Sequence, residues 1–158
     1  MNQHSAPPPD AVPRITPHLV VKGAPAALAL YEKALGAKEL YRTVGRDGRV
    51  LFSELILNDS RLFVVDEFPE QGALSPLTLG GTPITLHLYV ADVDTAFARA
   101  VAAGMDPVVP PANFFWGERY AQVKDPFGHR WALARRIEDL APDEVQRRAD
   151  AFYRSHRS

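Results

Sequence analysis

Hydrophobic and polar positions follow the same layout twice along the chain. In the first half, residues 15–21 (ITPHLVV) alternate between apolar and polar side chains, as in a strand with one buried face. Residues 26–36 then repeat apolar side chains at helical spacing between Pro25 and Gly36, which are common at the start and just after the end of a helix. Three extended segments separated by turn-forming residues follow, at about 38–44, 50–57 and 61–66. This half is therefore predicted to form a βαβββ module.

The second half repeats this layout at an offset of 69 residues, so that His87 matches His18. Residues 84–90 (ITLHLYV) alternate again, and Asp92 is a predicted N-cap for a helix that Gly104 ends. Strands are predicted at about 107–109, 119–124 and 130–135. The sequence thus predicts an α+β fold of two tandem βαβββ modules.

The segments outside the repeat have different patterns. Residues 1–13 include three consecutive prolines, which favours an extended or disordered arm. A domain is expected over 14–136, with modules at about 14–67 and 82–136, and a helical extension over 137–158. The extension has an amphipathic stripe of Val145, Ala149 and Phe152, so we expect it to brace the core or a dimer, or to dock a partner protein.

Period-two alternation divides the strand residues into two faces. One set is apolar and is assigned to packing under the helices: Leu19, Val21, Leu62, Val64, Leu86, Leu88, Val90, Trp131 and Leu133. The other set mixes polar and aromatic side chains: Thr16, His18, Phe63, Val65, Thr85, His87, Tyr89, Arg130 and Ala132. Such a mixture is typical of a ligand-binding concavity, so functional residues are expected on this second face.

Composition narrows the classes of function. The 158 residues carry a formal net charge of -1, which provides no field to attract nucleic acid. The chain has no cysteine, so thiolate chemistry is excluded. Its first 14 residues lack the basic and apolar pattern typical of a secretory signal, and no later run has the length needed to span a bilayer, so a cytoplasmic protein is expected.

Three segments make the resemblance to a known family specific: LYVADVDTAFARAVAAG, NFFWGERYAQVKDPFGHRW and IEDLAPDEVQRR. Together with the duplicated module, they resemble the glyoxalase, bleomycin-resistance and extradiol-dioxygenase (vicinal oxygen chelate) superfamily, and within it the PhnB-like branch. The resemblance implies that the modules form a cup-shaped mixed sheet, often in a homodimer. It also implies that a small molecule binds in that cup.

The same resemblance proposes four positions for the divalent metal of classical members, and they fall on Thr16, Phe63, Thr85 and Ala132. A catalytic divalent ion needs imidazole or carboxylate ligands, which these residues do not provide. No metal and no cofactor is therefore expected. The four positions are kept as predicted ligand-binding residues.

His18 and His87 are the first candidates for chemistry, because they occupy matching places on the mixed face. They are either acid–base or hydrogen-bonding groups of a pocket, histidines satisfied by the backbone, or a replacement metal pair. Glu54 interrupts an apolar segment; it is a base, a partner that orients a histidine, or a carboxylate paired with a nearby arginine.

An aromatic loop, NFFWGERY, completes the predicted site. Its residues Phe115, Trp116, Arg119 and Tyr120 suit a planar or anionic ligand; alternatively the rings plug the core and Arg119 pairs with Asp125 or Glu118. The leading hypothesis is metal-free binding of an aromatic or carbonyl-containing molecule. The alternatives are a lyase or isomerase that uses His18, His87 or Glu54, and a scaffold protein.

Overall fold

The structure is a computed structural model that describes residues 15–156, so the arm predicted at 1–13 lies outside the described residues. The first module comprises β1 (His18–Val21), α1 (Ala24–Leu35), β2 (Lys38–Val44), β3 (Val50–Leu57) and β4 (Ser60–Asp66). A connection with the short helices η2 (Pro69–Gln71) and α2 (Pro76–Leu79) follows. The second module comprises β5 (Thr85–Tyr89), α3 (Val93–Ala103), β6 (Asp106–Asn113), β7 (Glu118–Lys124) and β8 (Arg130–Arg136), and α4 (Pro142–Ser155) ends the chain.

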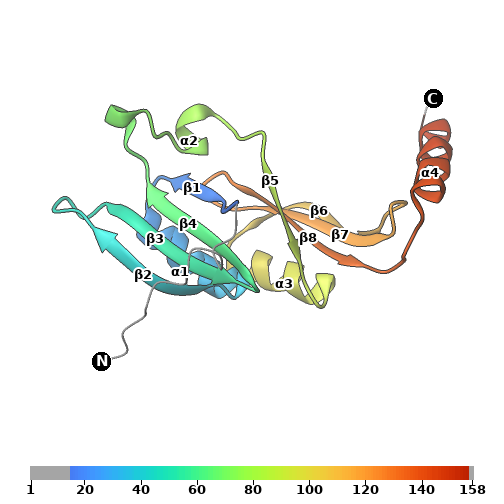
Figure 1. The fold of residues 1–158 in the computed structure, drawn as a ribbon, viewed down its shortest axis with the longest axis horizontal. Coiled ribbons are helices and arrows are strands. Elements are labelled where there is room, and N and C mark those ends of the chain that lie inside the picture. Colours follow the sequence, from blue (N-terminus) through green and yellow to red (C-terminus); the bar gives the residue numbers. More distant parts are fainter. Residues whose placement is uncertain (1–14, 157–158) are drawn as a thin grey trace.

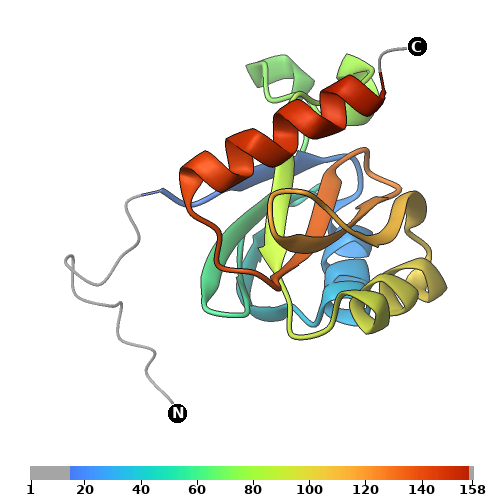
Figure 2. The same cartoon turned by 90° about the vertical axis from the view of Figure 1, so that its right-hand side faces the viewer.

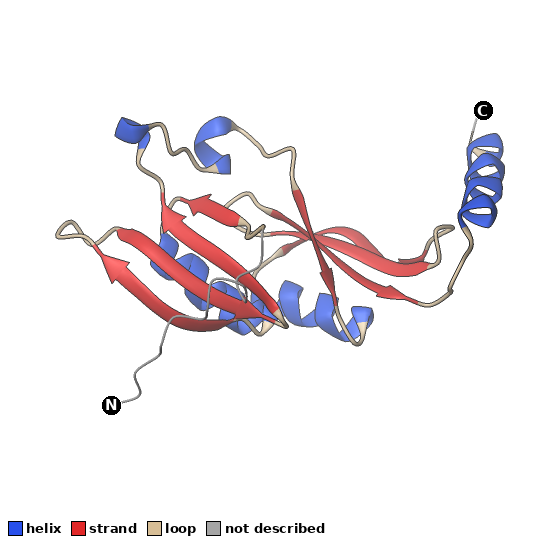
Figure 3. Cartoon of the chain, viewed as in Figure 1, coloured by secondary structure: helices blue, strands red, loops and turns tan. Residues whose placement is uncertain are grey.

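Each module forms its own four-stranded mixed sheet, in the orders β1-β4-β3-β2 and β5-β8-β7-β6 (Figure 3). In both sheets the first and last strands of the module pair in parallel and the other pairs are antiparallel. The predicted α+β fold of two βαβββ modules with a C-terminal helix is confirmed. The two sheets stay separate, however, and do not close into one cup within a single chain.

The core lies between the sheets and the helices α1 and α3. Helices α1 and α3 pack side by side along one side of the molecule (Figures 1 and 2). Leu19, Val64 and Trp131 of the predicted apolar set are at most 4% exposed, whereas Leu86 and Leu88 are only partly buried. The mixed face has two exceptions, Val65 and Ala132, which are also buried.

The two modules start their helices by different means. Helix α1 follows Gly23, which has no side chain to cap it, and Asp66 at the end of β4 accepts hydrogen bonds from the N–H groups of Gly23 (3.0 Å) and Ala24 (2.8 Å). Helix α3 carries its own cap, since Asp92 accepts from the N–H of Thr95. Arg135, which matches Asp66 at the offset of 69, instead donates to the carbonyl of Ala91.

One buried carboxylate ties the modules together. Asp125, 1% exposed, begins the turn between β7 and β8, where it accepts hydrogen bonds from the backbone N–H groups of Phe127 and His129. Its other oxygen accepts from Trp131 Nε1 (2.9 Å) and from the hydroxyl of Tyr31 on α1 (2.7 Å). Burial raises the pKa of Tyr31 well above its usual value, and the charge of Asp125 adds to this effect.

Prolines explain the main difference from the predicted elements. Strand β6 extends from Asp106 to Asn113, whereas the sequence pattern predicted a strand only over residues 107–109. The prediction stopped there because Pro110 and Pro111 lack the N–H that a central strand needs. β6 is the edge strand of its sheet, where a missing donor is tolerated. The short helices η2 and α2 were not predicted at all.

Helix α4 stands clear of both sheets at the far end of the second module (Figure 1). None of its residues is buried. Ion pairs hold it: Arg148 contacts Glu138 (2.8 Å) in the preceding segment and Glu144 (2.8 Å) in the helix itself. Within residues 15–156, no helix is both long enough and apolar enough to cross a bilayer.

Candidate functional site

The strongest candidate site lies on the second sheet, around one buried carboxylate. Glu118, at the start of β7, is only 7% exposed. Its Oε1 accepts a hydrogen bond from the hydroxyl of Tyr89 (2.7 Å), and its Oε2 accepts one from Trp116 Nε1 (3.0 Å). The Nε2 atom of His87 lies 3.5 Å from the same Oε2. This separation suits an ion pair when the imidazole is protonated.

Local structure explains how these groups meet. Strand β5 alternates, so that Leu86 and Leu88 are partly buried while His87 and Tyr89 are exposed on the opposite face. A tight hairpin joins β6 to β7: Phe114 N–H donates to the carbonyl of Glu118, and Gly117 N–H donates to that of Phe114. The turn brings the indole of Trp116 back over Glu118.

Small residues on β8 leave room for the rings above them. In the sheet register His87 lies beside Ala132, and Ala134 lies between Tyr89 and Tyr120. The ring of His87 is 5.0 Å from that of Tyr89 and 5.8 Å from that of Tyr120, measured between centroids. Ala132 thus contributes a floor to the cluster, not a polar contact.

The cluster is electrostatically organised around Glu118. Because the hydroxyl of Tyr89 donates to this carboxylate, and because burial and the charge of Glu118 act in the same direction, the pKa of Tyr89 is raised above its usual value. Arg136, opposite Glu118 in the register, counteracts part of this rise. Tyr89 therefore remains a neutral donor at physiological pH.

His18 and Glu54 lie on the first sheet, away from this cluster. The rings of His18, Phe63, Phe52 and Tyr41 follow one another across the sheet, with centroid separations of 6.1, 4.8 and 5.8 Å. Glu54, beside Phe63 in the register, forms an ion pair with Arg61 instead of assisting a histidine. His18 and His87 belong to different sheets, and no interaction joins them in the part of the chain that the structure describes.

Other predicted ligand-binding residues have identifiable contacts. Arg119 forms a bidentate pair with Asp94 at the start of α3 and also donates to Asn113, so neither predicted partner, Asp125 or Glu118, is correct. Arg130 donates to Gln122 (3.4 Å), which in turn donates to the hydroxyl of Tyr120 (3.3 Å).

Phe115 packs edge-on against Trp116. Thr16 precedes β1 and Thr85 begins β5, so each of the two threonines lies at the N-terminal end of its module. Neither one belongs to the cluster around Glu118.

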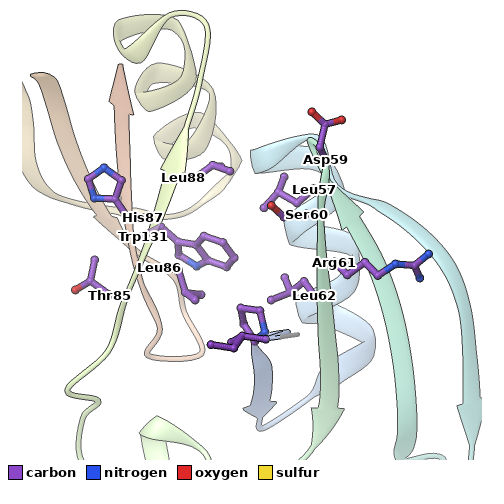
Figure 4. A pocket seen from close by; sticks show the side chains of 12 residues that line it. Leu57, Asp59, Ser60, Arg61, Leu62, Thr85, Leu86, His87, Leu88 and Trp131 are labelled. Atoms are coloured by element: carbon purple, nitrogen blue, oxygen red, sulfur yellow. The ribbon is translucent and has the colours of Figure 1, made fainter. Parts of the chain in front are cut away.

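A separate cleft of about 460 Å³ lies between the two modules (Figure 4). Leu86, Leu88 and Trp131 face Leu57 and Leu62 across it, whereas Thr85 and His87 point to the other side of β5. Asp59, Ser60 and Arg61 also line the cleft, but the side chains of Asp59 and Arg61 point away from the leucines (Figure 4). The cleft is therefore mainly a hydrophobic space next to the cluster.

The residues present do not fit a catalytic divalent metal. The four positions that correspond to classical ligands carry two threonines, a phenylalanine and an alanine. Among residues 15–156, no group of three or more histidine, cysteine, aspartate or glutamate side chains could hold an ion together. His87 and Glu118 supply two such groups, fewer than an ion normally takes from a protein.

Sequence reasoning assigned His87 and Tyr89 to the mixed face and Trp116 and Tyr120 to the aromatic loop, but it missed Glu118 as a site residue. The signal was present: Glu118 and Tyr120 are two positions apart, so their side chains share one face of a strand. Glu118 was interpreted only as a partner of Arg119. The hydrogen bonds from Tyr89 and Trp116 depend on the hairpin and on strand pairing across β8, which local patterns do not reveal.

A family model matches most of the chain. The family model described as the Glyoxalase/Bleomycin resistance protein/Dioxygenase superfamily matches residues 11–133. An uncharacterised protein of Mycobacterium tuberculosis is 41% identical over 137 residues, which cover 85% of this chain and 81% of that protein. A counterpart in Mycobacterium bovis has the same identity, with 90% of its length covered.

Solved structures share the fold. TioX from Micromonospora sp. ML1 aligns with a TM-score of 0.63 at 24% identity, over 80% of this chain and all of that one. A gene product of Arabidopsis thaliana gives the same TM-score at 28% identity, over 79% of this chain and all of its own. A glyoxalase/bleomycin resistance protein/dioxygenase from Nocardioides gives 0.62 at 24%, over 84% and 89% of the two chains.

Proposed function

Because the chain belongs to the glyoxalase/bleomycin resistance protein/dioxygenase superfamily, we propose that it binds a small aromatic or carbonyl-containing molecule on the second sheet around His87, without a metal. The observation that carries this proposal is the Glu118 cluster. A carboxylate that is 7% exposed orients Trp116 and Tyr89 beside an exposed imidazole. Pre-organised rings with a few fixed polar groups are what small-molecule sites commonly present.

We further propose that two copies build the complete site. The rings around His18 lie on the first sheet and the rings around His87 lie on the second sheet of the same chain. Both groups of rings are accessible to solvent, since Tyr41 is 50% and Tyr89 is 52% exposed. In a homodimer, the first sheet of one copy would cover the second sheet of its partner and enclose a flat ligand. Sedimentation equilibrium measures the mass of the particle; a monomer at ligand-binding concentrations would contradict this arrangement.

The binding proposal is tested with a collection of phenols, aromatic aldehydes and aromatic ketones, screened by saturation-transfer NMR. Each ligand found is then titrated into wild type, His87→Ala, Trp116→Ala and the control Gln146→Ala, which alters an exposed residue of α4. We expect both site variants to weaken binding by about tenfold or more, which corresponds to about 1.4 kcal/mol, and the control to bind as wild type does. Unchanged binding in both site variants would show that the ligand site lies elsewhere.

A second candidate function is acid–base catalysis by a lyase or isomerase, favoured by the 3.5 Å separation of His87 Nε2 and Glu118 Oε2. A neutral imidazole could accept a proton from the ligand, and Glu118 would stabilise the resulting imidazolium. Glu54 is a weaker candidate because it is paired with Arg61. Chromatography of each ligand after incubation separates the two functions: a binding protein returns it unchanged, whereas an enzyme converts it with a pH dependence that His87→Ala abolishes.

We also propose that the chain belongs to the PhnB-like branch of this superfamily and that the protein is cytoplasmic. The first rests on the WGER and DPFGHRW segments and on the EDLAPDE segment that leads into α4.

A further inference from the structure

Aromatic rings continue without interruption from the Glu118 cluster to the C-terminal helix. Six of them, hereafter the aromatic track, are His87, Tyr120, Trp116, Phe115, Phe152 and His156. Along this order, the centroid separations are 5.8, 5.7, 5.1, 5.3 and 4.1 Å. All five fall within or below the usual range for interacting ring pairs, so the track is one continuous aromatic surface.

The second half of the track is not used by the hydrophobic core. Phe152 is 39% exposed and the neighbouring Tyr153 is 65% exposed. Helix α4 buries none of its residues. Adjoining exposed rings can offer a binding surface, because burying a phenylalanine side chain is worth about 1.5–3 kcal/mol.

Polar contacts nevertheless fix α4 in place. The N–H groups of Ile137 and Glu138 both donate to the carbonyl of Gly117, immediately after Trp116. Arg148 then pairs with Glu138 and Glu144, and the hydrogen bonds from Arg147 and Arg148 lower the pKa of Glu144 to about 2. The position of Phe152 is therefore defined before any ligand arrives, which reduces the entropy cost of binding.

We propose that Phe115 and Phe152 form a second ring subsite, so that the ligand of this protein carries at least two aromatic rings. This inference rests on the proposed function, because the first ring is the one held at His87, Trp116 and Tyr120. The second ring packs against Phe115 and Phe152. Linked rings fit this surface better than one large flat system, because the pair Phe115–Trp116 meets at 87° while Phe115–Phe152 meets at 37°.

Phenol and 4-phenylphenol are the probes, since they differ only in the second ring. Dissociation constants are measured by calorimetry for wild type, Phe152→Ala, Phe152→Leu and the control Gln146→Ala. In wild type we expect 4-phenylphenol to bind about three- to tenfold more tightly than phenol, from the added ring contacts. Phe152→Ala should remove most of this ratio, Phe152→Leu should retain part of it, and phenol itself should change less than twofold.

Each result is decisive. If phenol binding depends on His87 but the ratio of the two probes is the same in wild type and Phe152→Ala, the second subsite is wrong and the proposed function stands. If neither probe binds to wild type, the ring subsites at both His87 and Phe152 are wrong. If Phe152→Ala instead converts a dimer into a monomer at an unchanged ratio, the exposed face of α4 is an interface between copies and the subsite is wrong.

Discussion

At the scale of single residues, the geometry of the candidate site depends on Glu118. It accepts hydrogen bonds from two aromatic side chains that are distant in sequence, Tyr89 and Trp116, and lies beside His87. A buried carboxylate with several donors is costly to leave without them, so these side chains keep their orientation. His87 lies 3.5 Å from Glu118, farther than the hydrogen-bonded atoms of Tyr89 and Trp116, and is therefore less constrained by this carboxylate than they are.

The pKa of Tyr89 reports directly on this arrangement. Replacing Glu118 by alanine removes the acceptor of the tyrosine hydroxyl together with the nearby negative charge, so the pKa of Tyr89 should fall toward its usual value near 10.0. Titration of 13C-labelled tyrosine by NMR measures this fall. Trp116→Phe, which keeps Glu118, is the matched control and should leave the pKa raised. Equal Tyr89 titrations in Glu118→Ala and wild type would argue against the hydrogen bond.

At the scale of elements, period-two and helical patterns predicted nearly every strand and helix of the repeat. They succeeded where a strand alternates between more and less buried residues, as in β1 and β5, and where a glycine ends the helix, as in α1 and α3. They failed where the position of a strand in its sheet matters more than its local sequence. Strand β6 contains Pro110 and Pro111, and these prolines are tolerated because β6 lies at the edge of its sheet. The two faces of the strands were also predictable, whereas the partners of Glu118 and Arg119 lie across sheet and helix contacts.

The hairpin between β6 and β7 leads to a prediction about Gly117. This residue has φ +88, and a Cβ atom there would lie 3.0 Å from Leu140 Cδ1 and 3.1 Å from the carbonyl oxygen of Glu138. We expect Gly117→Ala to lower the free energy of unfolding by about 2–3 kcal/mol, through backbone strain and displacement of the segment before α4. Urea unfolding measures the loss.

The matched control is Gly48→Ala. Gly48 has a similar φ of +82 but nothing within 4 Å of the added Cβ, so only the conformational cost of about 1 kcal/mol remains. Equal losses in the two variants would mean that the contact of Gly117 with residues 138–140 does not matter.

At the scale of the whole molecule, the hydrogen bond from Tyr31 to Asp125 joins the helix of one module to the closing turn of the other. Trp131 shares the same oxygen of Asp125, and its ring lies 5.3 Å from that of Tyr31. The contact between the modules therefore combines packing with a buried charge that is satisfied by four donors. The relative placement of the two sheets depends on this junction.

Tyr31→Phe should lower the free energy of unfolding at pH 7 by about 1.5–3 kcal/mol, the typical worth of a hydrogen bond to a charged group. Burial raises the pKa of Tyr31 above 10 in the folded state, so the stability that this group provides is complete below pH 10 and is lost as the pH rises further. Wild type should lose up to about 1.4 kcal/mol per pH unit above pH 10 relative to the variant.

Urea unfolding at pH 7 and pH 11 measures both effects. Tyr153→Phe, at a position that is 65% exposed, is the control and should stay within about 0.5 kcal/mol of wild type. A Tyr31→Phe variant as stable as wild type at pH 7 would contradict the assigned role of this junction.

The different starts of α1 and α3 bear on the history of the duplicated chain. At equivalent positions of the two modules, Asp66 accepts hydrogen bonds from backbone N–H groups, whereas Arg135 donates one to a backbone carbonyl. Both partners of each contact lie in the same half of the chain, so a chain made by fusing two copies of either half would keep that half's contact in both modules. The two halves have thus diverged at matching positions, each residue together with its own backbone partners.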